Sequence, residues 1–219
     1  NKQLAFLQHI YSGLKPGGRS AVVLPDNVLF EAGVGTEVRR DLMEKCNLHT
    51  ILRLPSGIFY AHGVKTNVLF FQKGSKSDPL QEENCTQSVW VYDLRTNMPN
   101  FGKRTPFTSA QLRTFEDAYG SDPNGNSVRA ENIEGIGESS RFRVFSREYI
   151  RENRDSLDIN WLSDSANLED NNLPTSEALA GEAMAELTEA LRELDELMRS
   201  LGAGDEAELE QKIIIGQRH

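Results

Sequence analysis

Hydrophobic positions near the start of the chain follow first a helical and then an extended pattern. Between residues 5 and 14 they recur every three or four positions, as on one face of an amphipathic helix, until Lys15-Pro-Gly-Gly18 ends the pattern. Residues 19–24 (RSAVVL) form a short continuous apolar run, which is typical of a strand covered on both faces of a parallel sheet. The pattern predicts a helix that leads directly into a buried strand.

The next apolar positions predict a crossover helix and two further strands. Residues 36–46 (TEVRRDLMEKC) have helical spacing after a threonine that could cap the helix, and residues 49–54 and 66–72 are two apolar runs. The loop between these runs has about eleven residues and no helical pattern, whereas a parallel pair would need a longer crossover. We therefore expect two antiparallel neighbours and the closing half of an open α/β sheet with one reversed strand.

The middle of the chain is less regular. Residues 88–93 (SVWVYD) alternate in polarity and predict an edge strand, and residues 110–119 predict a short helix. Residues 121–139 are rich in Gly, Asn and Ser, which favours a mobile loop.

Beyond residue 171 the apolar positions follow a heptad pattern. After a helix start at Pro174 they recur at alternating steps of four and three until Gly202-Ala-Gly204, at Ala180, Met184, Leu187, Leu191, Leu194, Met198 and Leu201. A single helix with such a seam needs another helix, either in its own domain or in a partner. We favour an intermolecular coiled coil, because the seam is narrow and its flanks are charged.

Composition and charge limit the possible functions. The chain has 219 residues, enough for one domain and an appendage, and residues 151–219 hold 17 of its 33 acidic residues but 6 of its 24 basic ones. A protein that grips DNA by itself normally presents a basic face, so any role with DNA should depend on partners or on further sequence. No apolar run reaches the length of a membrane span and no signal peptide is visible, which predicts a cytoplasmic protein.

Residues that could carry chemistry by themselves are scarce. Cys46 and Cys85 show no metal-binding spacing and are interpreted as ordinary thiols. His9, His49 and His62 also lack such spacing, and no Ser-His-Asp or Cys-His arrangement stands out. The residues alone therefore assign no acid–base pair.

Several motifs nevertheless occur in a distinctive order. They include Leu14-Lys-Pro-Gly-Gly18, Leu54-Pro-Ser-Gly-Ile-Phe59, Thr66 to Lys73 (TNVLFFQK) and Phe142 to Ile150 (FRVFSREYI). The ordered set resembles the later motifs of DNA methyltransferases that modify the amino group of adenine. It is most similar to the modification (M) subunit of type I restriction-modification systems.

The resemblance implies a fold and an activity. The fold would be α/β, the C-terminal half of a Rossmann-like class I methyltransferase sheet with an antiparallel last strand, followed by a helical or coiled-coil arm. Residues 1–120 would belong to the methyltransferase domain, 121–172 to a loop and family-specific extension, and 173–219 to the arm. The activity would be methyl transfer from S-adenosylmethionine to adenine N6. The family's cofactor loop and Asn-Pro-Pro-aromatic motif are expected before Asn1, so the chain alone is expected to be inactive.

The resemblance also implies roles for particular side chains. The target adenine must leave the duplex stack, and Phe59 corresponds to an aromatic residue that stacks on the flipped base, with Tyr60 as the alternative and Asp26 and Asn27 lining the same pocket. The alternative is a purely structural role, in which Phe59 packs under the sheet edge. The remaining implied contacts are Phe6 with the cofactor, or else with the core, and His62 and Lys65 with the DNA backbone.

The partners implied by the family are double-stranded DNA, the specificity (S) subunit and the restriction (R) subunit. The arm, through Met184, Leu187, Leu191, Leu194, Met198 and Leu201, would contact the S subunit. Two alternatives stay open from the residues, a non-catalytic interaction module with a coiled-coil arm and a small-molecule methyltransferase. A half sheet with an open edge also predicts self-association.

Overall fold

The computed structural model describes residues 2–59, 64–99, 101–102, 105–129 and 141–162, together with positions 184, 187, 188, 191, 192, 194, 195, 197 and 198. The chain divides into two compact units, residues 1–166 and residues 167–219. Tyr60, His62 and Leu201 lie outside the described residues, as do residues 130–140 of the loop segment.

The first unit contains helices and strands in the order α1 (Lys2–Gly13), β1 (Arg19–Pro25), α2 (Asn27–Phe30), α3 (Val34–Lys45), β2 (Cys46–Arg53), β3 (Thr66–Lys73), β4 (Ser88–Asp93), the 3-10 turn η1 (Ser109–Leu112), α4 (Arg113–Tyr119), β5 (Phe142–Ser146) and α5 (Arg147–Glu152). The predicted helices and strands are present, with shifted ends. The crossover helix begins after Gly33, whose φ is 63°, so Thr36 lies inside the helix and does not cap it.

The strands form one five-stranded sheet in the order β1-β3-β2-β4-β5. β3 is antiparallel to both β1 and β2, which confirms the predicted reversed strand and the pairing across the 55–65 loop. β4 pairs in parallel with β2 and antiparallel with β5, so its prediction as an edge strand is wrong. Among the described strands the edge on the β4 side of the sheet is β5, which follows a long irregular segment and gives only a short, weak sequence pattern.

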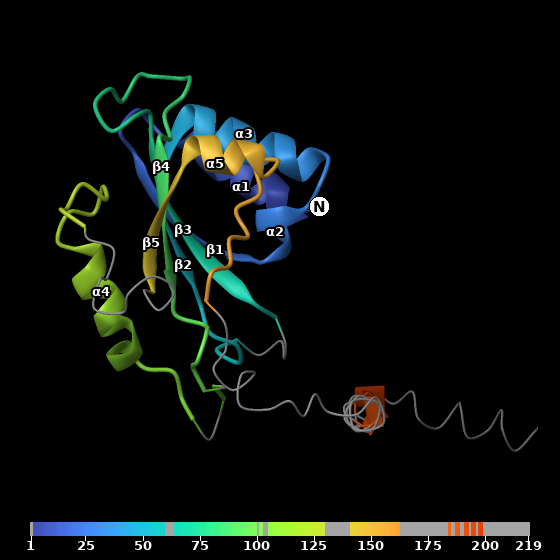
Figure 1. Cartoon of the computed structure of the whole chain (residues 1–219). Helices are drawn as coiled ribbons and strands as arrows, with labels where there is room; N and C mark the ends of the chain where they lie inside the picture. The colour runs from blue at the N-terminus through green and yellow to red at the C-terminus, as the bar shows by residue number, and fades with distance from the viewer. Residues whose placement is uncertain are drawn as a thin grey trace, which may run out of the picture. The chain divides into compact units, whose positions relative to one another are not determined.

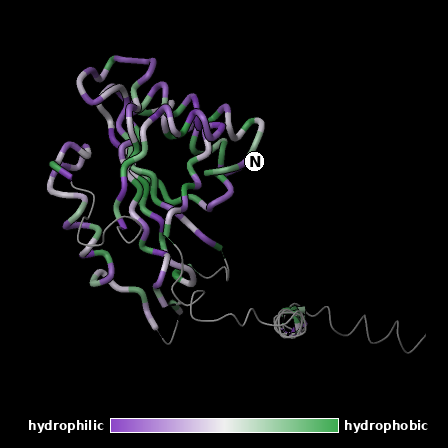
Figure 2. Tube along the Cα trace, in the orientation of Figure 1, coloured by the Kyte–Doolittle hydropathy of each residue, from purple (hydrophilic) through white to green (hydrophobic). Residues whose placement is uncertain are grey.

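Helices cover both faces of the sheet (Figure 1). Helices α1, α3 and α5 lie on one face and α4 lies on the other. Neighbouring residues of β2 alternate between the two hydrophobic clusters, with Ile51 in the cluster under α1 and α3 and Leu52 in the cluster under α4. Hydrophobic residues accordingly concentrate along the strands between the helical layers (Figure 2).

β1 does not match the prediction of a strand buried on both faces. Its side chains alternate between exposed and partly buried, and only Leu24 is fully buried. Val23 is 50% exposed, because β1 lies at the sheet edge and has β3 as its one described neighbour. β2 is instead the strand whose eight residues are all buried.

In the second unit, the described positions between 184 and 198 are helical, as the heptad pattern predicts for this segment. Five of the six predicted interface residues are described, and all five are exposed, from 43% for Met198 to 66% for Met184. No helix among the described residues of the chain is long and apolar enough to cross a membrane.

Candidate functional site

The candidate site lies where β1 and β2 end. Both strands run antiparallel to β3, so they point in the same direction and their carboxyl ends meet at one edge of the sheet. Open α/β sheets bind ligands at this edge. Asp26 follows β1 there, and the loop that begins at Leu54 and contains Phe59 follows β2.

Asp26 is held by an arginine that comes from after β4. The Nη1 and Nη2 atoms of Arg95 donate to the two carboxylate oxygens of Asp26 over 2.8 and 2.9 Å, and Asn67 Nδ2 donates to Oδ1 over 2.6 Å. Burial by itself would raise the pKa of Asp26, but its hydrogen bonds and the charge of Arg95 outweigh this and hold the pKa below its ordinary value. Asp26 is therefore ionised at neutral pH and engaged in an ion pair.

The same guanidinium group touches both ends of the Phe59 loop. Arg95 Nε donates to the carbonyl of Leu54 over 3.0 Å, and Nη2 donates to the carbonyl of Thr66 over 3.1 Å. The backbone closes the neck of the loop as well, since Leu54 N–H donates to Thr66 and Asp26 N–H donates to Lys65, each over 3.0 Å. Arg95 thus links the ends of β1, β2 and β3.

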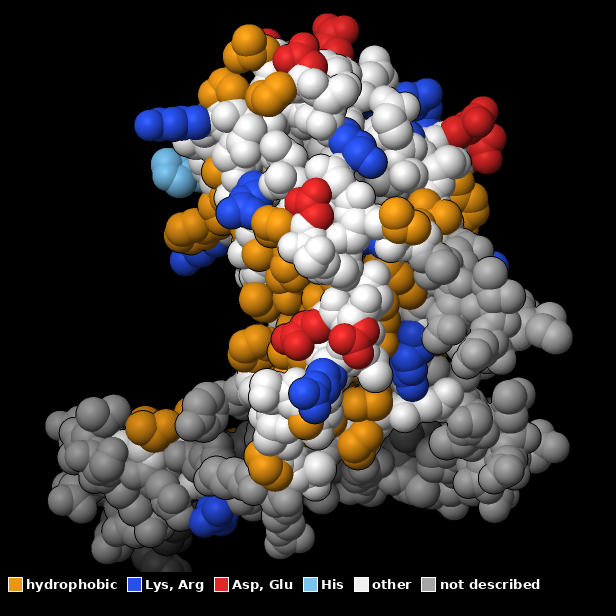
Figure 3. All heavy atoms as spheres, turned by 90° about the vertical axis from the view of Figure 1, so that its left-hand side faces the viewer, with side chains coloured by type: hydrophobic (Ala, Val, Ile, Leu, Met, Phe, Trp, Pro, Cys, Tyr) orange, Lys and Arg blue, Asp and Glu red, His pale blue; other side chains and the backbone are white. Residues whose placement is uncertain are grey.

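Phe59 is half-exposed rather than buried. Its exposed fraction is 46%, and its side chain lines an apolar groove of about 420 Å³ on the α4 side of the sheet. The other walls come from the loop, the strands and the segment before α4, namely Leu52, Leu54, Ile58, Val68, Phe70, Phe107, Leu112, Phe115 and Glu116. On the α4 side, hydrophobic side chains gather between charged ones (Figure 3). Since almost half of Phe59 is accessible, packing under the sheet edge does not account for the whole side chain.

The other expected site residues fall in different places. Asn27 begins α2 and its side-chain amide donates to Glu31 over 3.3 Å, while Lys65 is exposed at the end of the loop. Phe6 is 67% exposed on α1, although the next residue, Leu7, is completely buried. The core interpretation of Phe6 is therefore wrong, and its contact with the cofactor remains a prediction.

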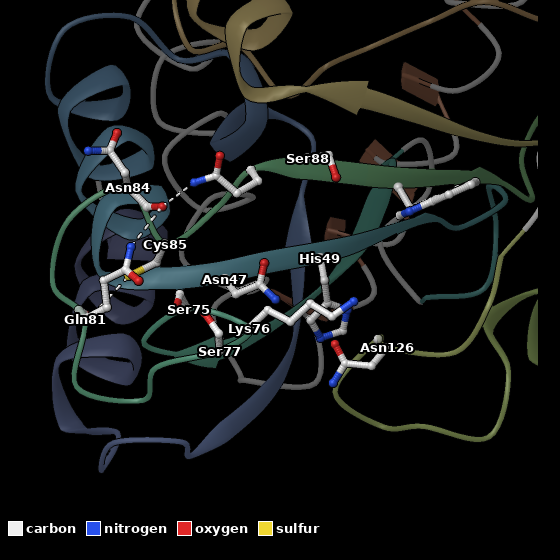
Figure 4. Close-up of a pocket in the computed structure, with 13 residues that line it drawn as sticks. Asn47, His49, Ser75, Lys76, Ser77, Gln81, Asn84, Cys85, Ser88 and Asn126 are labelled. Atoms are coloured by element: carbon white, nitrogen blue, oxygen red, sulfur yellow. Dashed lines mark hydrogen bonds between the residues drawn. The ribbon is translucent and has the colours of Figure 1, made fainter.

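A second, polar pocket of about 240 Å³ opens near the amino ends of β2 and β4. Figure 4 shows Asn47, His49, Lys76 and Asn126 around it. Burial, with a smaller contribution from the charge of Arg129, lowers the pKa of His49 to about 4, so the imidazole is neutral at physiological pH. Gly125 lies against the His49 ring in a left-handed conformation with a φ of +72°, and a side chain there would collide with the ring.

Arg95 is the residue of the site that the sequence did not reveal. Its partners Leu54 and Asp26 lie 41 and 69 residues away in the sequence, so no local spacing connects them. The segment Val91-Tyr-Asp-Leu-Arg95, which spans the end of β4 and also resembles the methyltransferase family, is the one sequence signal that includes it. In the part of the chain that the structure describes, no group of three His, Cys, Asp or Glu side chains could hold a metal ion.

Comparison with known proteins extends over almost the whole chain. Residues 1–171 match the family described as N-6 DNA Methylase, and residues 173–215 match the family described as Type I restriction enzyme methylase subunit, C-terminal domain. The chain is 57% identical to the type I restriction enzyme StySJI methylase subunit of Salmonella typhimurium and to the EcoKI methylase subunit of Escherichia coli. Each alignment covers 98% of this chain and 44% of the relative.

A solved structure agrees with these matches. The crystal structure of the type I restriction enzyme EcoKI M protein superimposes with a TM-score of 0.72 at 55% identity, and the match covers 100% of this chain and 48% of that one. The chain therefore spans less than half the length of the relatives that it matches.

Proposed function

Because the chain belongs to the N-6 DNA methylase family, among the modification subunits of type I restriction-modification systems, we propose that it forms part of an enzyme that methylates adenine N6 in DNA. Its α/β unit would be the closing half of a Rossmann-like methyltransferase sheet, as the reversed strand β3 between β1 and β2 supports. S-adenosylmethionine would supply the methyl group. The isolated chain would transfer none, since it carries no Asn-Pro-Pro-aromatic motif.

The observation that carries this proposal is the exposure of Phe59 at the carboxyl edge of the sheet. A flipped adenine needs a flat apolar surface to replace the stacking that it loses, and base–aromatic stacking contributes roughly 1–3 kcal/mol. Phe59 offers such a surface, because its loop is anchored to the ends of β2 and β3 while the residue stays 46% exposed. Tyr60 would be the alternative platform.

The surrounding residues would contact the DNA backbone, the flipped base and the cofactor. Lys65 is exposed at the foot of the loop and could neutralise a phosphate of the DNA backbone, with His62 in the same loop. Asn27 would line the base pocket, whereas the ion pair with Arg95 gives Asp26 a supporting role at its wall. Phe6, exposed on α1, fits an apolar contact with the cofactor's adenine.

Assembly would depend on the C-terminal arm. Met184, Leu187, Leu191, Leu194 and Met198 recur at heptad spacing, and all of them are exposed. Such a seam is stable when another helix covers it, and we assign that helix to the specificity subunit, which would bring the complex to its DNA sequence. The restriction subunit would join the same assembly. Uncovered, the seam and the edge strand β1 would favour self-association.

The proposal is tested by methyl transfer from tritiated S-adenosylmethionine to unmethylated DNA, with the full-length subunit and its specificity partner. Phe59→Ala should lower kcat/KM for DNA by about 5–150-fold, the equivalent of roughly 1–3 kcal/mol of lost stacking, while cofactor binding is unchanged. Phe30→Ala is the matched control, since Phe30 is also half-exposed, at 53%, but ends α2. Equal rates for all three proteins would contradict the role of Phe59.

A further inference from the structure

One side chain from a distant part of the sequence holds both ends of the loop that carries Phe59. Arg95 donates to the carbonyl of Leu54, where the loop leaves β2, and to the carbonyl of Thr66, where it joins β3. We propose that Arg95 is a positioning residue for adenine methylation, which fixes the neck of the loop so that Phe59 is presented to the flipped base. This inference rests on the proposed function.

The geometry requires a guanidinium group. Nε donates to Leu54, Nη1 donates to Asp26, and Nη2 donates to both Asp26 and Thr66. Three nitrogen atoms in one plane thus bind three segments of the chain. A lysine would carry the same charge, but its donors share a single nitrogen atom and could not reach both ends of the loop. Arg95 is therefore expected to be irreplaceable by Lys even though the positive charge is kept.

Two carboxylates orient Arg95 for this task. The carboxylate of Asp26 accepts two parallel hydrogen bonds from the Nη1–Nη2 edge of the guanidinium group, an arrangement that fixes the plane of that group. Asp93 acts on the backbone, because its Oδ1 accepts from the N–H of Arg95 over 2.8 Å and from the N–H of Thr96 over 2.7 Å. The side chain of Arg95 is 11% exposed, so little freedom remains for it.

The segment after Arg95 supports the loop a second time. The N–H of Phe101 donates to the carbonyl of Ser56 over 3.1 Å, and the buried Phe101 ring packs edge-on against Phe107 with 5.1 Å between ring centroids. Phe107 also lines the groove beside Phe59. These contacts do not involve Arg95. Loss of Arg95 should therefore loosen the neck of the loop and leave the packing of Phe101 and Phe107 in place.

The test compares Arg95→Ala and Arg95→Lys in the full-length subunit bound to its specificity partner. Amide hydrogen exchange at Leu54 and Asp26, whose N–H groups donate to Thr66 and Lys65 across the neck, should accelerate at least about tenfold in both variants, because the side-chain hydrogen bonds that reinforce this closure are lost. When 2-aminopurine replaces the target adenine, its fluorescence rises as the base leaves the stack. This rise should be absent in both variants. The kcat should fall about 10–100-fold, while the KM for S-adenosylmethionine stays the same.

Arg147→Lys is the matched control. Arg147 also forms a buried pair with an aspartate, Asp155, at 2.6 Å, but it belongs to α5 and not to the loop neck. It should lower thermal stability without changing loop exchange or base flipping. If Arg95→Ala and Arg147→Lys lower stability equally and both leave kcat and the 2-aminopurine signal unchanged, Arg95 is merely structural and the inference is overturned.

The exchange measurement separates this inference from the proposed function. Unchanged exchange in Arg95→Ala would overturn the anchoring of the loop, whatever the catalytic result. Faster exchange together with a Phe59→Ala variant that methylates normally would instead contradict the stacking role of the loop, and with it the proposed function of Phe59. We expect both Arg95 variants to show faster exchange, no rise in 2-aminopurine fluorescence and a low kcat.

Discussion

Arg95 and Asp26 form a two-point ion pair, with N–O distances of 2.8 and 2.9 Å, between residues separated by 69 positions in the sequence. The side chains are 11% and 20% exposed, so solvent screens the pair only weakly. Hydrogen bonds between charged groups in such surroundings contribute about 1.5–3 kcal/mol. The pair should therefore be a major determinant of local stability.

A double-mutant cycle with Arg95→Ala and Asp26→Ala should give a coupling free energy of about 1.5–3 kcal/mol in urea unfolding. Lys45 and Asp41 provide the comparison, since they also form a 2.8 Å pair but their side chains are 42% and 36% exposed. That cycle should give less than about 1 kcal/mol. Equal coupling free energies in the two cycles would mean that burial does not strengthen the Arg95–Asp26 pair.

The protonation of His49 should make stability depend on pH. The pKa of His49 is about 4 in the folded chain, against an ordinary value near 6.5, so the unfolded chain binds the proton first as pH falls. The free energy of unfolding should therefore be fully retained above pH 6.5 and decrease between pH 6.5 and pH 4, by up to about 3 kcal/mol.

The neutral variant His49→Gln isolates this effect, because the carboxylates titrate equally in both proteins. The difference in unfolding free energy between wild type and variant should shift in favour of the variant as pH falls from 6.5 to 4. A difference that stays constant over this range would show that His49 is not protonated more easily in the unfolded chain.

Phe6 and Leu7 allow a functional contact to be distinguished from a packing contact. Leu7→Ala should cost about 2–5 kcal/mol of stability, because Leu7 is completely buried, whereas Phe6→Ala should change stability by less than about 0.5 kcal/mol. In the full-length subunit, Phe6→Ala should still weaken binding of S-adenosylmethionine about 3–10-fold, measured by calorimetry. Unaltered cofactor binding would remove Phe6 from the site.

The parts of the fold that the sequence predicted correctly have strong local patterns. The pairing of β2 with β3 followed from two apolar runs and a loop too short for a parallel crossover. β5 was missed because Phe142–Ser146 has a short alternation and pairs with β4, about fifty residues earlier in the sequence. The exposure of β1 was missed since an apolar run does not reveal which of its faces is covered.

The site shows the same contrast. Phe59 could be proposed from the sequence because the Leu54-Pro-Ser-Gly-Ile-Phe59 motif resembles a known family, and its role in base stacking stays a prediction. Arg95 could not, because an arginine in a sequence gives no sign of its partners, and Leu54, Asp26 and Thr66 approach it only after the sheet has formed. Motifs thus indicated the chemistry, and tertiary contacts indicated what positions it.

The proposed methylation of adenine N6 is best tested by identifying the methylated nucleoside. Unmethylated DNA would be incubated with S-adenosylmethionine, the full-length subunit and its specificity partner, digested to nucleosides and analysed by mass spectrometry. We expect N6-methyl-2′-deoxyadenosine, in smaller amounts with Phe59→Ala and with Arg95→Ala than with the wild type. Methylated cytosine alone, or DNA without any methylated base despite bound cofactor, would contradict the proposed function.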